Sequence, residues 1–254
     1  MTDGMKLVVD VGMHLGNDTE RYLQQGYRVV GVEANPVLAA EAQRRFAGEI
    51  EADRLLVLPV AVARRTGTAS LTIFGEQDGW STMSAARTEV ARARGYAGKP
   101  VTVVARRFSD ILDAVGTPYY LKVDIEGSDM LCVEALRGRT QIPEFLSIES
   151  AVSAPGASFA AVVRELWALY RLGYWRFTYV DQSQGDGNTS GGFGDEVSGW
   201  QTLPKALRHG LWLRVKWHVF GNTGSRWCRW RFKRADAAGR HLDIRWYDVH
   251  ARRV

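Results

Sequence analysis

The chain has 254 residues with a formal net charge of +5, and 46% of its residues are hydrophobic. This size and composition are typical of one large soluble domain, or of one domain with an insertion. No segment approaches the roughly 18 uninterrupted apolar residues that a membrane span needs. Asp10 interrupts the first apolar run, so no secretory signal is expected. Cys132 and Cys228 fit neither a disulfide framework nor metal-ligand spacing, and we expect a cytoplasmic protein.

Strand-like and helix-like segments alternate along most of the chain. In chain order, strands are predicted at 7–11, 28–33, 54–62, 69–74, 99–105, 119–127, 144–150, 174–180 and 241–251. Helices are predicted at 17–26, 36–48, 108–116, 129–138 and 159–173. Repeated strand–helix–strand units favour an α/β fold with a doubly wound, mostly parallel sheet covered by helices on both faces.

Acidic residues follow or end several of the predicted strands. They are Asp10, Glu33, Asp124, Glu126 and Glu149. In open α/β sheets, ligands bind outside the carboxyl ends of the strands. One such acid would be read as a helix cap, but five at one edge predict a binding site.

The first strand leads into a turn with two glycines, Gly12 and Gly16, after Asp10. This spacing differs from the G-x-G-x-x-G pattern that binds a pyrophosphate, and an acid at this point would repel one. It suits a ligand with a positive group, such as an amino-acid ammonium, while Glu33 can accept the two hydroxyls of a ribose. S-Adenosylmethionine has both groups and no phosphate. The alternative is an ordinary α/β turn followed by a surface glutamate.

The C-terminal quarter differs in composition from the rest. Residues 182–204 are rich in Gly, Ser and Asp and predict a long loop, either disordered or a lid. Residues 201–254 hold thirteen Lys and Arg against three acids, together with five Trp. These tryptophans either pack an insertion onto the sheet or bind an acceptor, since aromatic faces pair with sugar rings and Arg with anions. No nucleic-acid-binding motif is present.

Several segments resemble the successive motifs of FkbM-type methyltransferases. They are VDVGMHLGNDT (9–19), GVEANP (31–36), PVAV (59–62), YLKVDIEGSDMLCVEAL (120–136), TSGGFGDEVSGW (189–200) and WYDVHA (246–251). The resemblance spans nearly the whole chain and is weakest at 201–240. It implies a Rossmann-like class I methyltransferase fold with a seven-stranded sheet and a C-terminal insertion. It also implies S-adenosylmethionine-dependent O-methylation, commonly of sugar hydroxyls.

The resemblance also implies roles for individual residues. The cofactor would be bound by Asp10, Gly12, Gly16, Thr19, Glu33, Asn35, Ala61 and Asp124. Of these, Ala61 would lie near the adenine, and Asp124 beside the transferring methyl group together with Glu126. Met13-His14 stands where the family commonly has Ala-Asn, so His14 either replaces a hydrogen-bonding Asn or acts as a general base.

Methyl transfer to an alcohol needs a group that accepts its proton. Candidates are Asp124, Glu126, Glu149, His14, His218 and His250, and we rank Glu126, Asp124 and His14 first. Acids at adjacent strand ends could also hold Mg²⁺, but no spacing requires a metal and none is predicted.

We therefore predict a single methyltransferase domain over 1–254, with a lid or acceptor-binding insertion at 182–240. The expected acceptor is a small molecule or a glycan-containing molecule, with anionic groups as an option. Peripheral contact of the protein with a membrane is a further option. One alternative is an RNA methyltransferase, which the basic end would fit. The other is a non-catalytic module that binds glycans or membrane surfaces on a methyltransferase scaffold. The sequence does not indicate the oligomeric state.

Overall fold

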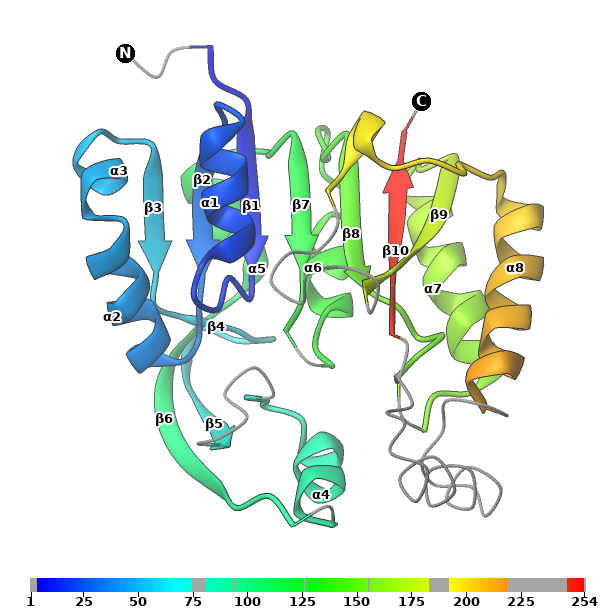
Figure 1. Ribbon diagram of the computed structural model, residues 1–254, viewed down its shortest axis with the longest axis horizontal. Helices are drawn as coiled ribbons and strands as arrows, with labels where there is room; N and C mark the ends of the chain where they lie inside the picture. Colours follow the sequence, from blue (N-terminus) through cyan, green and yellow to red (C-terminus); the bar gives the residue numbers. More distant parts are fainter. Residues whose placement is uncertain are drawn as a thin grey trace, which may run out of the picture. The chain divides into compact units, whose positions relative to one another are not determined.

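The computed structural model describes residues 4–74, 81–93, 95–125, 127–154, 156–182, 192–218 and 246–253. Seven strands form one sheet in the order β3-β2-β1-β7-β8-β10-β9, and three further strands form a second sheet (Figure 1). The predicted seven-stranded, mostly parallel α/β sheet is confirmed, with an antiparallel pairing between β9 and β10. The chain divides into two compact units, Met1–Ile148 and Glu149–Val254. The prediction of a single domain stays a prediction.

The first unit is built on parallel strands that are almost wholly apolar. They are β3 (Leu55–Leu58), β2 (Arg28–Val32), β1 (Leu7–Val11), β7 (Tyr120–Val123) and β8 (Phe145–Glu149), each paired in parallel with the next. Continuous apolar runs are expected where helices cover both faces of a sheet. The register places Asp10 between Gly31 and Lys122, which brings two charged residues side by side in the core.

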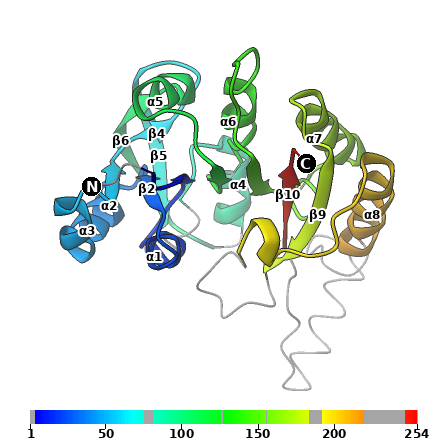
Figure 2. The same cartoon turned by 90° about the horizontal axis from the view of Figure 1, so that it is seen from above.

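Helices cover both faces of these strands. They are α1 (Asn17–Gln24), α2 (Pro36–Arg45), α3 (Ala47–Glu51), α5 (Phe108–Val115) and α6 (Met130–Ala135). In the view from above, α1 lies on one face of the strands, and α5 and α6 lie on the other (Figure 2). The N-terminus of α2 has Pro36 in its first turn, as predicted, and the side chain of Asn35 accepts a hydrogen bond from the Val37 N–H.

A small second sheet in the first unit was not predicted as a separate element. It contains β4 (Ala61–Val62), β6 (Gly98–Arg106) and β5 (Gly67–Phe74), and α4 (Ala85–Ala93) lies between β5 and β6 in the chain. The prediction of one strand over 54–62 is wrong, because the chain leaves the large sheet after Leu58 and β4 pairs with β6. Pro59 marks this break, since it has no N–H to donate to a strand partner.

The second unit combines a two-stranded antiparallel ladder with two packed helices. Its elements are α7 (Phe159–Arg171), β9 (Arg176–Asp181), the 3₁₀ turn η3 (Gly194–Glu196), α8 (Leu203–Lys216) and β10 (Tyr247–Arg252). A cluster of buried residues, Val152, Val162, Leu213 and Tyr247, joins the two helices to the ladder.

The sequence did not predict α8, which lies within the expected insertion at 182–240. Of that range, 183–191 and 219–240 lie outside the described residues, and the first of these two segments belongs to the loop predicted at 182–204. The predicted strand at 241–251 is described from residue 246 onward. Among the helices that the structure describes, none is long and apolar enough to cross a membrane.

Candidate functional site

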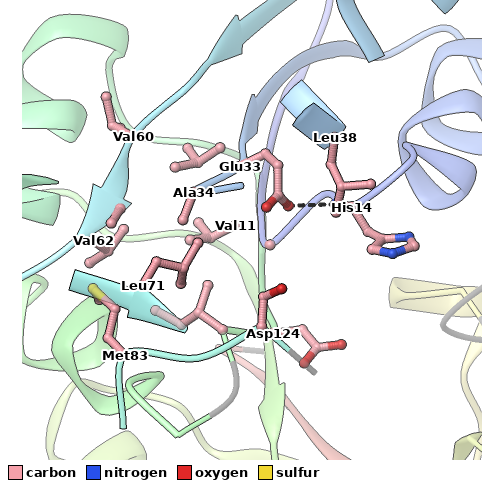
Figure 3. Close-up of a pocket in the computed structure, with 15 residues that line it drawn as sticks. Val11, His14, Glu33, Ala34, Leu38, Val60, Val62, Leu71, Met83 and Asp124 are labelled. Carbon is pink, nitrogen blue, oxygen red and sulfur yellow. Dashed lines mark hydrogen bonds between the residues drawn. The ribbon is translucent and has the colours of Figure 1, made fainter. Parts of the chain in front are cut away.

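A pocket opens at the carboxyl ends of β1, β2 and β7 in the first unit (Figure 3). Its polar lining includes Glu33, Asp124 and His14. Its apolar lining includes Leu38 from α2 together with Val60, Ala61, Val62, Leu71 and Met83, from β4, β5 and the segments beside them. The pocket therefore combines an apolar wall with two carboxylates at the strand ends, as expected for a ligand with a flat apolar part and several hydroxyls.

Glu33 directly follows β2, and its carboxylate is held by two backbone groups. One oxygen accepts the His14 N–H at 2.9 Å (Figure 3), and the other accepts the Asn35 N–H at 2.8 Å. Burial raises the pKa of Glu33 above its ordinary value, while the N–H groups of Asn35 and His14 oppose the shift. An ionised carboxylate offers about four acceptor positions. Two N–H bonds therefore leave acceptor capacity for the two hydroxyls of a ribose.

His14 contributes to this arrangement through its backbone. Its φ of 52° lies in the left-handed region, which is uncommon for residues other than glycine. This conformation accompanies the bond from its N–H to Glu33, while its imidazole ring extends away from that carboxylate (Figure 3). The sequence prediction concerned the side chain of His14 rather than this backbone role, and His14 is among the residues that line the pocket.

Gly12 lets two strand ends approach each other closely. A Cβ atom at this position would lie 1.9 Å from the carbonyl oxygen of Asp124 and 2.8 Å from its carbonyl carbon. The Gly12 N–H also donates to the Val32 carbonyl oxygen at 2.8 Å. The absence of a side chain thus lets the ends of β1 and β7 lie close together, which places Asp124 at the pocket beside Gly12.

Asp10 belongs to a buried ion triad. Lys122 Nζ lies 3.2 Å from an Asp10 oxygen and 3.2 Å from an Asp18 oxygen, and Thr19 donates its hydroxyl to Asp10 at 2.8 Å. Burial lowers the pKa of Lys122, but the carboxylates of Asp10 and Asp18 raise it by more, and it lies well above its usual range. The positive group beside Asp10 is therefore the protein's own lysine. That Asp10 also faces the ammonium group of a ligand stays a prediction.

Three other predicted cofactor residues act in the scaffold of the pocket. Thr19 bonds Asp10, as described above. Gly16 precedes α1 with a φ of 81°, and a Cβ there would lie 2.5 Å from the Phe46 ring. Asn35 caps α2 and donates its N–H to Glu33. None of the three is among the residues that line the pocket, whereas Gly12, Glu33, Ala61 and Asp124 are.

The segment after β7 is organised by Asp129, which the sequence reasoning missed. Its carboxylate accepts the N–H groups of Ile125 at 3.2 Å and of Gly127 at 3.1 Å. Burial raises the pKa of Asp129 to about 6, and the charge of Asp124 adds to the shift. Asp129 thus stabilises the turn that begins at Asp124, through these two hydrogen bonds. Glu126, ranked first as general base, lies outside the described residues.

The remaining candidate bases belong to the second unit. Glu149 ends β8, and His218 is exposed just after α8. His250 is buried in β10 opposite Thr178, and burial lowers its pKa to about 4. None of these three lines the pocket. Within the described ranges, no group of three or more His, Cys, Asp or Glu side chains is arranged to hold a metal ion.

The sequence signals for Lys122 and Asp129 are single residues rather than repeating patterns. Lys122 is a charge within the apolar run YYLKV, and such a residue needs an acidic partner when buried. Asp129 stands two residues after Gly127 at the start of a helix, where acids commonly accept backbone N–H groups. Nothing in the sequence of Leu71 or Met83 indicated that they would lie at this pocket.

The chain is similar to a known family in sequence and to known proteins in structure. Residues 10–174 match the family described as Methyltransferase FkbM domain. No curated protein matches the sequence. Three solved structures illustrate the structural likeness, all at low sequence identity.

The precorrin-6y C5,15-methyltransferase of Geobacter metallireducens GS-15 is 8% identical, with a TM-score of 0.41 over 98% of this chain and 81% of that one. The geranyl diphosphate C-methyltransferase of Streptomyces coelicolor A3(2) is 12% identical, with a TM-score of 0.39 over 99% and 76%. StiE O-MT residues 961–1257 are 12% identical, with a TM-score of 0.44 over 99% and 69%. The family match covers more than half of the chain, from the end of β1 to beyond α7. The chain belongs to the FkbM methyltransferase family and is an S-adenosylmethionine-dependent methyltransferase.

Proposed function

We propose that this enzyme binds S-adenosylmethionine in the pocket of the first unit and methylates a hydroxyl group of a carbohydrate-containing acceptor. The observation that carries the cofactor site is the Glu33 carboxylate, held by two backbone N–H groups at the edge of an apolar pocket. A carboxylate after the second strand of a doubly wound sheet is well placed to accept ribose hydroxyls. The acceptor class rests on the family resemblance.

The pocket residues fit the parts of this cofactor. Glu33 would accept the ribose hydroxyls, and the adenine would lie against Ala61, Leu38 and Leu71. Gly12 and Asp124 would lie toward the methionine end. The residues behind the pocket keep this arrangement in place: Asp10 and Lys122 join β1 to β7, and Asn35 fixes the Glu33 carboxylate.

The chemistry needs positioning and a proton acceptor. S-Adenosylmethionine supplies a methyl group activated by a sulfonium. The protein must hold the acceptor hydroxyl in line with that methyl group and take its proton. Of the bases ranked first, Asp124 and His14 line the pocket. Glu126 remains a proposed general base, because it lies in the same family-like motif as Asp124, YLKVDIEGSDMLCVEAL (120–136).

The cofactor site is tested by titration with S-adenosylhomocysteine, followed calorimetrically. We expect Glu33→Ala to weaken binding at least about 100-fold, because hydrogen bonds to a charged group contribute roughly 1.5–3 kcal/mol each. Glu41→Ala, an exposed acid on α2, is the matched control and should bind as the wild type does. Equal affinity of the Glu33→Ala and wild-type proteins would refute the assignment.

Binding should also depend on pH through Glu33. Burial raises the pKa of this carboxyl above 4.5, and the protonated form has lost one acceptor oxygen. Affinity for S-adenosylhomocysteine should therefore fall as the pH is lowered through the raised pKa, starting above the pH where an ordinary glutamate titrates. Titrations between about pH 8 and pH 4 measure this, because that range extends below the ordinary pKa of a glutamate. A flat profile across that window would contradict the role of Glu33.

His14→Asn tests whether the His14 imidazole is the general base, against the backbone role that its N–H has in the structure. Asparagine tolerates the left-handed conformation and keeps the N–H that bonds Glu33. If the residue serves through its backbone, the variant should bind S-adenosylhomocysteine and transfer methyl groups as the wild type does. If the imidazole is the proton acceptor, binding should persist while kcat falls by about 10²–10⁴.

The acceptor is tested by methyl transfer from radiolabelled cofactor to a panel of polysaccharides, glycolipids and glycosylated small molecules, with RNA as a separate arm. We expect label in a glycan fraction, at a position that mass spectrometry assigns to a hydroxyl. Label in RNA, together with binding that weakens steeply with salt, would favour the RNA alternative instead.

A further inference from the structure

The outer face of α7 in the second unit carries a row of exposed apolar side chains. Phe159, Val163, Trp167 and Tyr170 recur at helical spacing along one side of the helix, and Trp175 follows just before β9. We call these five residues the aromatic stripe. Phe159, Val163, Trp167 and Trp175 are 40–51% exposed, and Tyr170 is partly exposed.

The aromatic stripe is not the face by which α7 packs into the second unit. Val162, Leu166 and Leu169 lie on another side of the helix, where they are fully buried. An amphipathic helix that buries one apolar face normally presents polar residues on the others. A second, exposed apolar row on the same helix therefore indicates a partner.

The aromatic rings of the stripe are held together as a cluster. The Trp167 and Tyr170 rings stack with their centroids 5.5 Å apart, and Tyr170 meets Trp175 edge-on at 5.0 Å. Contacts among the rings limit their freedom, so little side-chain entropy would be lost on binding. Large, fixed amphipathic rings are characteristic of surfaces that lie at a lipid–water boundary.

Exposed arginines accompany the stripe on α7 and at the start of β9, and α7 has no exposed acid. Arg164 and Arg171 of α7 are exposed, as is Arg176 at the start of β9. The single acid of α7, Glu165, is buried, where it accepts hydrogen bonds from Ser150 and from the Ala151 N–H. The partner should therefore be anionic as well as apolar.

The neighbouring helix α8 also combines exposed apolar side chains with basic ones. Its sequence, LPKALRHGLWLRVK, contains no acid, and its exposed residues include Lys205, Arg208, Trp212 and Val215. Lys216 Nζ lies 4.3 Å from the centre of the Trp212 ring, so cation and aromatic ring are again combined.

We propose that the aromatic stripe is a docking surface for an anionic lipid bilayer. Trp, Tyr and Phe side chains would enter the boundary between headgroups and acyl chains, while the arginines meet lipid phosphates. Two other occupants fit less well. A second copy would bring like charges together with no exposed acid on α7 or α8 to balance them. A sugar would find Trp167 and Tyr170 stacked on each other, and Phe159 and Val163 offer no hydrogen bond to its hydroxyls.

The test is co-sedimentation of the full chain with sucrose-loaded vesicles at low ionic strength. One set contains phosphatidylcholine alone, and the other contains phosphatidylglycerol at roughly one third of the lipid, which supplies the anionic surface. We expect the protein to sediment with the anionic vesicles, and to be released by salt because the attraction is partly electrostatic.

Two double variants separate the apolar from the charged contribution. Trp167→Ser with Trp175→Ser should lower the partition coefficient at least about tenfold, through lost apolar burial. Arg164→Glu with Arg171→Glu should lower it by roughly 25-fold or more, since each basic residue near an anionic surface contributes about fivefold. The matched controls are Val37→Ser with Val104→Ser, and Arg44→Glu with Arg65→Glu, which are exposed in the first unit and should bind as the wild type does.

Melting temperatures and S-adenosylhomocysteine affinity should be unchanged in all four variants, which shows that folding and the proposed cofactor site are intact. The proposal is overturned by equal binding to neutral and anionic vesicles, by no vesicle binding, or by stripe variants that bind like their controls. It is also overturned if size-exclusion chromatography shows a dimer that the stripe variants dissociate, or if a soluble oligosaccharide binds the wild type and not the stripe variants.

Discussion

Replacement of Lys122 by methionine should lower the free energy of unfolding by about 3–5 kcal/mol, because it leaves uncompensated charge in the core. Lys122 is 4% exposed and lies within 3.2 Å of carboxylate oxygens of both Asp10 and Asp18. Methionine fills a similar volume, so the loss measures charge rather than packing. Urea unfolding of the two proteins at pH 7 gives the difference.

The acids provide the control for this experiment. A protein with Lys122→Met, Asp10→Asn and Asp18→Asn should recover much of the stability, since a neutral replacement of a whole buried ion cluster is often tolerated. Burial raises the pKa of Asp10 while Lys122 opposes the shift, so without the lysine this carboxyl should take up a proton at higher pH. The loss in the single variant should therefore shrink as the pH falls from 7. A loss below about 1 kcal/mol, unchanged by pH, would show that the triad is not the stabilising element proposed here.

Lys122 itself contributes in the opposite pH direction. Its folded-state pKa is raised above the ordinary 10.5, so its contribution is fully present below that value and is lost as the pH rises through the raised pKa. The free energy of unfolding of the wild type should therefore fall at strongly alkaline pH, where Lys122 loses its proton in the folded protein.

Gly12→Ala should disrupt the pocket far more than the same change at Gly26. Both glycines have a φ of 85°, so alanine meets the same unfavourable conformation at each, at a cost of roughly 1–2 kcal/mol. At Gly26 no atom lies within 4 Å of the new methyl group, whereas at Gly12 it would overlap the Asp124 carbonyl at 1.9 Å. The comparison therefore isolates the close approach of β1 and β7 from backbone strain.

The expected result is a loss of stability at Gly12 that exceeds the loss at Gly26 by at least about 3 kcal/mol, since the overlap is with backbone rather than with a flexible side chain. If the Gly12 variant still folds, its affinity for S-adenosylhomocysteine should fall at least about 100-fold, because Gly12 and Asp124 border the same pocket. Equal losses at the two glycines, with binding retained, would show that the close approach is not needed.

Much of this protein could be read from local patterns. Alternating strand and helix segments predicted the α/β sheet, and Pro36 marked the start of α2. The pattern also located pocket residues, because an acid placed just after a buried strand must lie at the carboxyl edge of a parallel sheet. Glu33 and Asp124 were found in this way, and both line the pocket.

Other features depend on which strands become neighbours, and local patterns do not carry that information. Residues 54–62 look like one apolar strand, but β3 and β4 enter different sheets, and the second sheet supplies Leu71 to the pocket. The aromatic stripe likewise required the exposure of α7 to be known, since its sequence alone does not distinguish a second apolar face from core.

Asp10 shows the division between the two sources of information. From the sequence alone, an acid at the end of the first strand suits a positive group, such as one that belongs to a ligand. Which positive group it meets was decided by the pairing of β1 with β7, which brings Lys122 to it from 112 residues away. The chemistry of a residue is local, but its partner is set by long-range strand pairing, which only the tertiary structure shows.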